Sequence, residues 1–389
     1  MPPNNHAILG ASSAHRWLAC TASARLEQGF ADKPSEHAAE GTLAHAVVEA
    51  RLSRLLAGKK PLTPAKLKKH ELYKPVMDEH ADAFADYVFE QLTEAREHCP
   101  DAIVLLEQRI DYSEYVPEGF GTADVVLIAD GEMHVFDYKY GKGVPVVATN
   151  NSQIRLYSLG AYLEFRCLYD IRRITGHIFQ PRLDSATRET LETSALLGWA
   201  TDYVRPRALD AYEGKGDPTP GEHCRWCRFK NSCRAYAMRQ LNLAKYQFHE
   251  PEHQEKLPVE LRPAEIAAIL TQVDELTRWA KSVKEFALEQ AIHHGVEYPG
   301  YKVVEGRSNR KIANADEAMK LLLDAGHNLT DLVEPKGLTA LEETIGKKAL
   351  AELLGDLIIK PAGKPVLAPE DDKRPALNNA ASVFQPIDD

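Results

Sequence analysis

The chain has 389 residues, of which 44% are hydrophobic and 27% are charged, and its formal net charge is −10. These values are ordinary for a soluble globular protein, and the length suffices for two domains or one elaborated domain. The acidic balance excludes generic binding of polyanions, so any contact with nucleic acid must come from local basic patches. No apolar run approaches the roughly 20 residues that span a bilayer, and the N-terminus lacks a signal-peptide pattern. We therefore expect a cytoplasmic protein without membrane contact.

The first part of the chain predicts helices that lead into a strand. A short helix or turn near the N-terminus presents Cys20, and apolar residues at helical spacing predict helices over about residues 35–56 and 76–98. His45 lies in the first of these two helices, next to its apolar stripe. On spacing alone, a histidine at such a position is more often a core residue than a ligand. Residues 103–110 form a strand candidate.

Two apolar runs on either side of Asp130-Gly131 predict a β-hairpin with a type I′ turn. That turn places residues whose numbers sum to 261 opposite each other, so Asp124 faces Asp137, and Lys139 projects from the same face. Like charges that face each other across two strands are destabilising unless something compensates them. The hairpin therefore predicts a site for a divalent cation. The alternative is a solvent-facing acidic hairpin with a salt bridge.

The segment after the hairpin predicts a helix and a further strand. Residues 150–152 offer N-cap chemistry for a helix that runs to about residue 168. Gln153 and Tyr157 are four residues apart on this helix and share a face, which is either part of the site or plain helix surface. Residues 174–180 follow as a strand. Helices, three strands, a helix and a strand in this order predict an α/β/α core around a mixed sheet.

The rest of the chain is predicted to be mainly helical. A long helical region covers about residues 185–212. The later predicted elements are a helix over 263–293, a short strand over 298–304, and helices over 315–325 and 338–354. We therefore divide the chain into a first domain over 1–245, a mainly helical region over 250–360, and an extended or disordered tail over 361–389.

The cysteines are unevenly distributed. Cys224, Cys227 and Cys233 form a C-x2-C-x5-C cluster, which in a cytosolic protein indicates a metal site before a disulfide. Cys20 is the candidate for a fourth ligand. The two other cysteines, Cys99 and Cys167, stand alone in the sequence.

Taken together, these residues resemble the RecB-like branch of the PD-(D/E)xK nuclease superfamily. The family pattern of a helix-borne histidine, G-x-x-D, D-x-K and Q-x-x-x-Y is met by His45, Gly121 with Asp124, Asp137 with Lys139, and Gln153 with Tyr157. Each motif alone is weak, but the ordered set is specific. The resemblance implies a restriction-endonuclease-like α/β/α core with a mixed sheet and a mainly helical C-terminal region. The whole chain also resembles an uncharacterised phage and prophage group of such proteins.

The resemblance implies a metal-dependent DNA nuclease, an exonuclease that acts on DNA ends or single strands. The implied ligands of one or two Mg²⁺ or Mn²⁺ ions are His45, Asp124, Asp137 and the carbonyl of Tyr138. The resemblance thus makes His45 a ligand, where spacing alone favours a core residue. Glu107 of the preceding strand stays outside this set, because the sequence does not fix its face of the sheet.

The resemblance also gives roles to the residues that do not bind the cation. Lys139 would orient or deprotonate the attacking water and stabilise the charge that develops on the phosphate. Gln153 and Tyr157 would position the substrate backbone or support the site.

A subset of these nucleases carries one cysteine before the core and three after it, and these hold a [4Fe-4S] cluster that ties the ends of the domain together. Cys20 and the three clustered cysteines fit this arrangement, and structural Zn²⁺ is the alternative. The rival functions are a non-catalytic DNA-binding or recombination accessory protein of the same fold and a zinc-stapled RNA-processing factor. The C-terminal region could recruit a polymerase, helicase or single-strand-binding protein, or close over the substrate channel.

Overall fold

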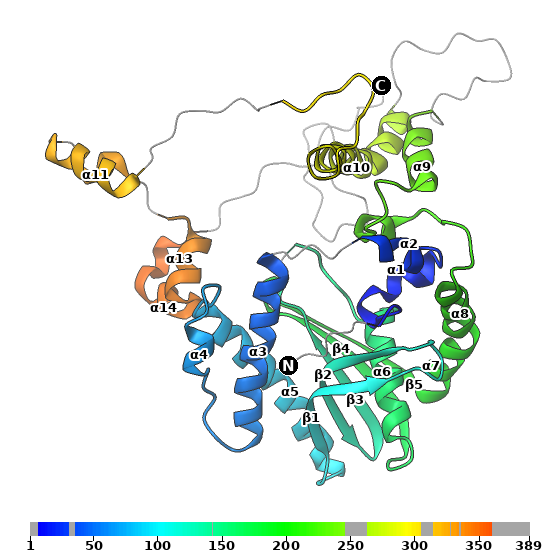
Figure 1. Ribbon diagram of the computed structural model, residues 1–389. Coiled ribbons are helices and arrows are strands. Elements are labelled where there is room, and N and C mark those ends of the chain that lie inside the picture. Colours follow the sequence, from blue (N-terminus) through cyan, green and yellow to red (C-terminus); the bar gives the residue numbers. More distant parts are fainter. Residues whose placement is uncertain are drawn as a thin grey trace, which may run out of the picture. The chain divides into compact units, whose positions relative to one another are not determined.

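The computed structural model describes residues 7–30, 36–141, 143–245, 263–304, 314–326, 328–333 and 336–359. The chain divides into two compact units, Met1–Glu334 and Pro335–Asp389. The larger unit is built on a five-stranded mixed sheet with helices on both faces (Figure 1), so the predicted α/β class is confirmed. The predicted tail over 361–389 lies outside the described residues. The boundary near residue 250 stays a prediction.

The sheet contains its strands in chain order, from β1 at one edge to β5 at the other. The strands are β1 (Ile103–Asp111), β2 (Phe120–Ala129), β3 (Gly131–Tyr138), β4 (Ile171–Gln180) and β5 (Ser185–Glu192). β3 and β4 pair in parallel, and the other neighbours pair antiparallel. A parallel pair needs a crossover, and the helix α6 (Ser152–Phe165) provides it. The predicted mixed sheet is therefore confirmed.

The β2–β3 hairpin has the predicted register but a different turn. Val125 pairs with Phe136 and Ala129 with Glu132, so the numbers of paired residues sum to 261. Gly131 has a positive φ of 89°, but Asp130 does not have a positive φ, so the predicted type I′ turn is wrong. The backbone N–H of Asp130 faces the sulfur of Cys99, and the N–H of Gly131 donates to the Asp170 carbonyl. These tertiary partners orient both turn peptides.

β5 corrects the prediction of one long helical region over 185–212. Ser185–Glu192 forms an edge strand that pairs antiparallel with β4, and exposure alternates along it. The helical part then contains α7 (Thr193–Trp199), a π-helical turn (Ala200–Val204) and α8 (Arg205–Glu213). Hydrogen bonding to β4 outweighs the local helix preference of this polar segment. The predicted strand over 298–304 is also wrong, because these residues follow their helix without regular structure.

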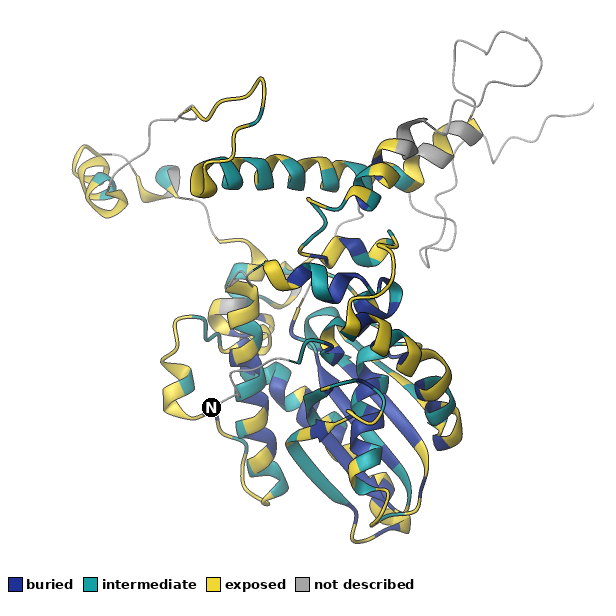
Figure 2. Cartoon of the chain, turned by 45° about the vertical axis from the view of Figure 1, so that its right-hand side comes forward, coloured by how far each residue is buried: buried dark blue, intermediate teal, exposed yellow. Residues whose placement is uncertain are grey.

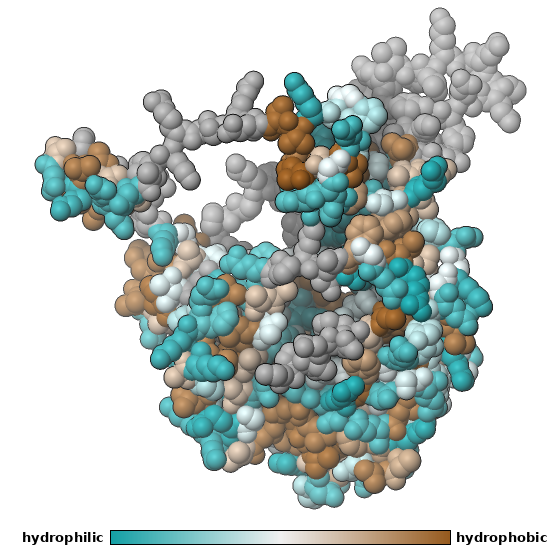
Figure 3. Space-filling model, viewed as in Figure 1, coloured by the Kyte–Doolittle hydropathy of each residue, from teal (hydrophilic) through white to brown (hydrophobic). Residues whose placement is uncertain are grey.

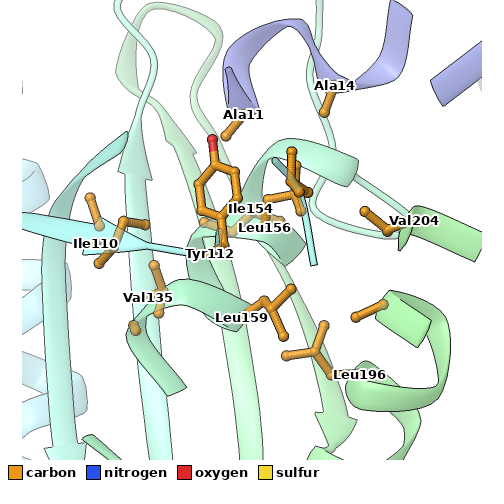
Figure 4. Packing of buried hydrophobic residues seen from close by; sticks show 14 of the residues in the cluster. Ala11, Ala14, Ile110, Tyr112, Val135, Ile154, Leu156, Leu159, Leu196 and Val204 are labelled. Carbon is orange, nitrogen blue, oxygen red and sulfur yellow. The ribbon is translucent and has the colours of Figure 1, made fainter. Parts of the chain in front are cut away.

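Each face of the sheet carries its own hydrophobic core. On one face, α6, α7 and α8 pack with the N-terminal helices α1 (Ala14–Ala19) and α2 (Ser23–Leu26). Figure 4 shows part of this cluster, with Ala14 of α1, Leu159 of α6 and Leu196 of α7. On the other face, α3 (Glu36–Leu56) and α5 (Val76–His98) pack against β2 and β3. Figure 2 shows the resulting buried strands. The central strands β2 and β3 are apolar on both faces because both faces are covered.

Helix α6 lies very close to the sheet because glycines stand at its contact points. A Cβ atom at Gly176 of β4 would lie 2.7 Å from Ile154, and one at Gly121 of β2 would lie 2.9 Å from the Tyr157 ring. The helix begins as predicted, since the Asn151 side chain accepts hydrogen bonds from the first backbone N–H groups. The glycine of the G-x-x-D motif is therefore required for the position of Tyr157.

The remaining elements are helical. They are α4 (Ala65–Lys68), α9 (Arg234–Lys245), α10 (Pro263–His294), α11 (Ala315–Asp324) and α12 (Leu329–Leu332) in the larger unit, and α13 (Leu338–Ile345) and α14 (Lys347–Leu354) in the smaller. Glu275 of α10 accepts hydrogen bonds from Tyr236 and Gln240 of α9. Figure 3 shows hydrophilic and hydrophobic side chains interspersed on the visible surface. None of the described helices is long and apolar enough to span a membrane.

Candidate metal centre and cysteine cluster

The candidate metal centre lies at the middle of β2, beside the end of β3. Asp124 and Asp137 face each other in the register of the hairpin, one step beyond the last paired residues, Val125 and Phe136. Asp124 Oδ2 accepts the backbone N–H of Tyr138 at 2.7 Å, and its Oδ1 lies 3.1 Å from His45 Nδ1. One carboxylate therefore joins α3 to both strands of the hairpin.

His45 faces this site and is not a residue of the hydrophobic core. Its ring lies edge-on to the Tyr138 ring at 5.5 Å, and a third of its side chain is exposed. Burial lowers the pKa of His45, but the hydrogen bond and the charge of Asp124 outweigh burial, so the net shift is upward. A cation bound here would displace the proton that this environment favours.

A second group forms around Asp137, whose side chain is almost fully buried. Lys139 Nζ lies 3.0 Å from Oδ1 of Asp137, and Gln153 Nε2 donates to the same oxygen at 3.1 Å. Gln153 Nε2 also lies 3.4 Å from the hydroxyl of Tyr157. Burial raises the pKa of Asp137, and the charge of Lys139 opposes this shift. Gln153 and Tyr157 thus face the site, and the solvent-exposed acidic hairpin is excluded.

Glu107 is the site residue that sequence reasoning left out. Ligand atoms of His45, Glu107 and Asp124 all lie within 4.8 Å of one another. In the register of β1 and β2, Glu107 stands opposite Asp124. Withdrawal of its carboxylate from water, followed by the charge of Asp124, raises the pKa of Glu107 to about 7.

The backbone of Glu107 explains why its face could not be read from the sequence. Its φ is +47°, a left-handed conformation that is rare for a residue other than glycine. Before it, Ile103 and Leu105 pack toward the α6 side of the sheet, and after it Ile110 and Tyr112 do so. The alternation along β1 therefore changes from odd to even numbers at Glu107. The signal that could have identified the residue is its place opposite Asp124.

The donor set can hold one divalent cation. An imidazole nitrogen and two carboxylates are within reach of a single ion, and the buried Oδ2 of Asp137 forms an ion pair with Lys139 Nζ at 2.9 Å. Oxygen-rich sets of this kind suit Mg²⁺ or Mn²⁺. The Tyr138 carbonyl as a further ligand stays a prediction.

The four predicted cysteine ligands line one small cavity of about 20 Å³. Cys20 follows α1, Cys224 lies in a short 3-10 helix, Glu222–Trp226, and Cys227 and Cys233 follow within a few residues. Burial, followed by the charge of Glu27, raises the pKa of the Cys227 thiol to about 12. Two backbone N–H groups point at these sulfurs, from Thr219 to Cys20 and from Gly221 to Cys224, each at 3.4 Å.

Two cysteines lie away from this cavity, as their isolation in the sequence suggested. Cys99 is buried beside the hairpin turn, and Cys167 is exposed. The cavity therefore gathers the cysteines on either side of the sheet-forming segment, about 200 residues apart in the chain.

Fold and site together define an α/β protein with a histidine–carboxylate centre at the end of a hairpin and a four-cysteine cavity. The chain belongs to the family described as "Protein of unknown function (DUF2800)", whose model matches residues 6–375. A solved structure described as "Crystal structure of SSO0001" matches at 14% sequence identity and a TM-score of 0.20, covering 56% of this chain and 95% of that chain. Membership in an uncharacterised family that spans nearly the whole chain is thus confirmed.

Proposed function

We propose that the protein is a metal-dependent DNA nuclease of the RecB-like PD-(D/E)xK type, an exonuclease that acts on ends or single strands. The observation that carries the proposal is the convergence of His45, Asp124 and Glu107 beside Asp137 and Lys139. Phosphodiester hydrolysis needs a cation to neutralise the phosphate, a group that handles the proton of water, and groups that orient the substrate. Each of these requirements has a candidate among the residues at this end of the sheet.

The metal-binding part of the proposal is supported by the donor set. His45, Glu107 and Asp124 would hold Mg²⁺ or Mn²⁺, and Asp137, whose Oδ2 lies 2.9 Å from Lys139 Nζ, would be a further ligand. When bound, the cation neutralises phosphate charge and lowers the pKa of a bound water. The cation would add to the compensation that Lys139 gives Asp137 and that His45 gives Asp124.

Lys139, Gln153 and Tyr157 would orient the attacking water and the side chains around it. Lys139 Nζ is fixed by Asp137, and the partial exposure of its side chain leaves it accessible to a water or a phosphate oxygen. Gln153 holds Asp137 from the helix side, and Tyr157 contacts Gln153 from the next turn of α6. We infer that Lys139 handles the proton of the attacking water, while Gln153 and Tyr157 fix the geometry around it.

The test is a time course of degradation with Mg²⁺ or Mn²⁺ on end-labelled single-stranded and double-stranded DNA, with a covalently closed circle as control. We expect linear DNA to shorten and the circle to survive. Asp124→Asn and Lys139→Ala should each reduce the rate by about 10²-fold or more. Asp130→Asn, at the exposed turn of the same hairpin, is the matched control and should retain the wild-type rate.

Cleavage that persists in both Asp124→Asn and Lys139→Ala would overturn the assignment. Binding of DNA without cleavage across several metals would instead support the non-catalytic accessory protein.

We further propose that the cysteine cavity holds a [4Fe-4S] cluster. The four cysteines line one cavity, and such a set can hold a tetrahedral Zn²⁺ with Zn–S bonds of about 2.3 Å or an iron–sulfur cluster. A four-iron cluster carries one thiolate on each iron and takes wider spacing. Ser23, which lines the cavity, has a fully buried hydroxyl with no partner among the described residues, and a cluster sulfur would satisfy it.

The cluster is tested by anaerobic purification followed by iron, sulfide and zinc analysis and by visible absorption. We expect about four irons and four sulfides per chain for this cluster type. Stoichiometric zinc without iron would overturn the cluster assignment and show that the cysteines hold Zn²⁺.

A further inference from the structure

A cavity of about 590 Å³ opens beside the candidate metal centre. Its walls come from the N-terminal segment with α1 and α2, from the adjoining parts of β1 and β2, and from α6. Tyr157 belongs both to this wall and to the chain of contacts that leads through Gln153 to Asp137. Thr122, two residues before Asp124, also lines the cavity. Tyr157 and Thr122 therefore connect a ligand in the cavity with the metal centre.

The wall carries positive charge in a chain that is acidic overall. Three arginines line it, Arg16, Arg109 and Arg228, against one carboxylate, Glu27. That carboxylate is already engaged, since it lies 2.8 Å from Arg16 and accepts the backbone N–H of Arg228 at 2.7 Å. A locally cationic wall attracts an anion against the acidic background.

Arg109 is the best-placed group for that anion. It is exposed, and no described carboxylate forms an ion pair with it. Its guanidinium lies 5.0 Å from the centroid of the Phe120 ring, so it stands over the face of this aromatic ring at the first residue of β2. A planar cation beside an aromatic ring can bind a phosphate and stack a base. The hydroxyl of Ser12 adds a neutral donor to the same wall, whereas the hydroxyl of Ser13 donates to the Gly10 carbonyl.

We propose that this cavity binds a nucleotide of a single DNA strand next to the phosphate that is cleaved, with Arg109 on the strand's backbone. The inference rests on the proposed nuclease function and adds a preference for single strands. The volume is in the range of small-ligand pockets, about 300–1,000 Å³, which fits a nucleotide-sized group and excludes a duplex. The two strands at the end of a duplex must therefore separate before one of them enters the cavity.

The experiment measures binding of a fluorescent oligo(dT) and of a DNA duplex of the same length, with Ca²⁺ in place of Mg²⁺ to prevent cleavage. Arg109→Gln should weaken binding of the single strand about 5–10-fold. It should also reduce the slope of log K against log salt concentration by about one, the value for one phosphate contact. Arg109→Lys should restore part of the binding. Arg172→Gln, which removes an exposed arginine of β4 that pairs with Asp170 and does not line the cavity, is the matched control and should change nothing.

The outcomes separate this inference from the proposed function. Asp124→Asn should abolish cleavage, and Arg109→Gln added to this variant should still weaken binding of oligo(dT). If the protein cleaves nothing but Arg109→Gln selectively weakens single-strand binding, the cavity assignment holds and the nuclease assignment fails. If the protein cleaves DNA and Arg109→Gln leaves the ratio of single-strand to duplex binding unchanged, the cavity assignment is overturned. Tighter binding of oligo(U) than of oligo(dT) would overturn the assignment to DNA.

Discussion

Glu107 stands opposite Asp124 across β1 and β2, and the left-handed backbone of Glu107 interrupts the ladder between these two strands at this pair. Leu106 and Gln108 on either side keep their partners, so the interruption is confined to one residue. The irregular backbone brings a second carboxylate beside Asp124 and His45. Strained residues of this kind persist where the surrounding structure holds them, and they are frequent at functional sites.

Glu107→Gln should weaken the binding of Mn²⁺. The substitution keeps the size of the side chain and removes the charge, and even the loss of an outer-shell group typically costs roughly 10–100-fold in metal affinity. Isothermal titration of Mn²⁺ into the protein measures the effect. Glu114→Gln, an exposed carboxylate that pairs with Arg166, is the control and should bind as the wild type does. Equal affinity in both variants would remove Glu107 from the ligand set.

The backbone strain at Glu107 can be separated from its charge by comparing Glu107→Gly with Glu107→Ala. Both changes remove the carboxylate, but only glycine adopts a φ of +47° without a steric cost. The left-handed conformation costs an L-residue roughly 1–2 kcal/mol, part of which the greater unfolded-state entropy of glycine offsets. We expect the glycine variant to be more stable by about 1 kcal/mol in urea unfolding. A less stable glycine variant would show that the conformation at Glu107 carries no strain.

Gly121→Ala should displace Tyr157 from the site. The new Cβ atom would lie 2.9 Å from the Tyr157 ring, and overpacking of this kind costs about 1–3 kcal/mol. Gly198→Ala, where a Cβ atom meets nothing within 4 Å, is the control. Because the clash needs the ring, the double variant Gly121→Ala/Tyr157→Ala should lose less stability than the sum of the single variants. Additive free energies of unfolding would contradict this contact.

His177 should make the protein less stable below neutral pH. The residue is fully buried, its ring stacks on Phe136 at 4.3 Å, and its nitrogens contact Tyr87 and His134. Burial, followed by the charge of His134, lowers the pKa of His177 to about 2, from 6.5 in the unfolded chain. Below about pH 6.5 the unfolded state takes up a proton that the folded state does not, so stability falls as the pH decreases.

From pH 7 to pH 5 this single group should reduce the free energy of unfolding by about 2 kcal/mol. Urea unfolding at both pH values measures the change. In His177→Gln the loss over this interval should shrink by that amount, whereas His37→Gln, at an exposed position, should keep the wild-type pH dependence. An unchanged pH dependence in His177→Gln would exclude His177 as its source.

Ser23 should tune the proposed cluster. Its buried hydroxyl lines the cysteine cavity and has no partner among the described residues. A hydrogen bond to a cluster sulfur stabilises the more negative, reduced state, so Ser23→Ala should shift the reduction potential to a more negative value. Redox titration followed by electron paramagnetic resonance measures the shift, and Ser23→Thr should keep the donor. A potential that is the same in Ser23→Ala would show that the hydroxyl does not reach the cluster.

The sequence by itself determined the hairpin and its register. The apolar runs around Asp130-Gly131 fix which residues face each other, because a slip of one position would turn every buried side chain to the other face. Local chemistry likewise determined the start of α6 at Asn151, since capping involves only neighbouring residues. The spacing of Cys224, Cys227 and Cys233 indicated a metal site before any fold was known.

The tertiary structure alone decided the features that depend on distant partners. The turn at Asp130 is set by Cys99 and Asp170, and β5 is a strand because β4 pairs with it. Nothing in the residue type of Glu107 encodes a positive φ, so only the fold shows that this carboxylate completes the group with His45 and Asp124. Periodicity and capping act within a few residues, whereas a site is assembled by contacts between segments that the sequence alone does not bring together.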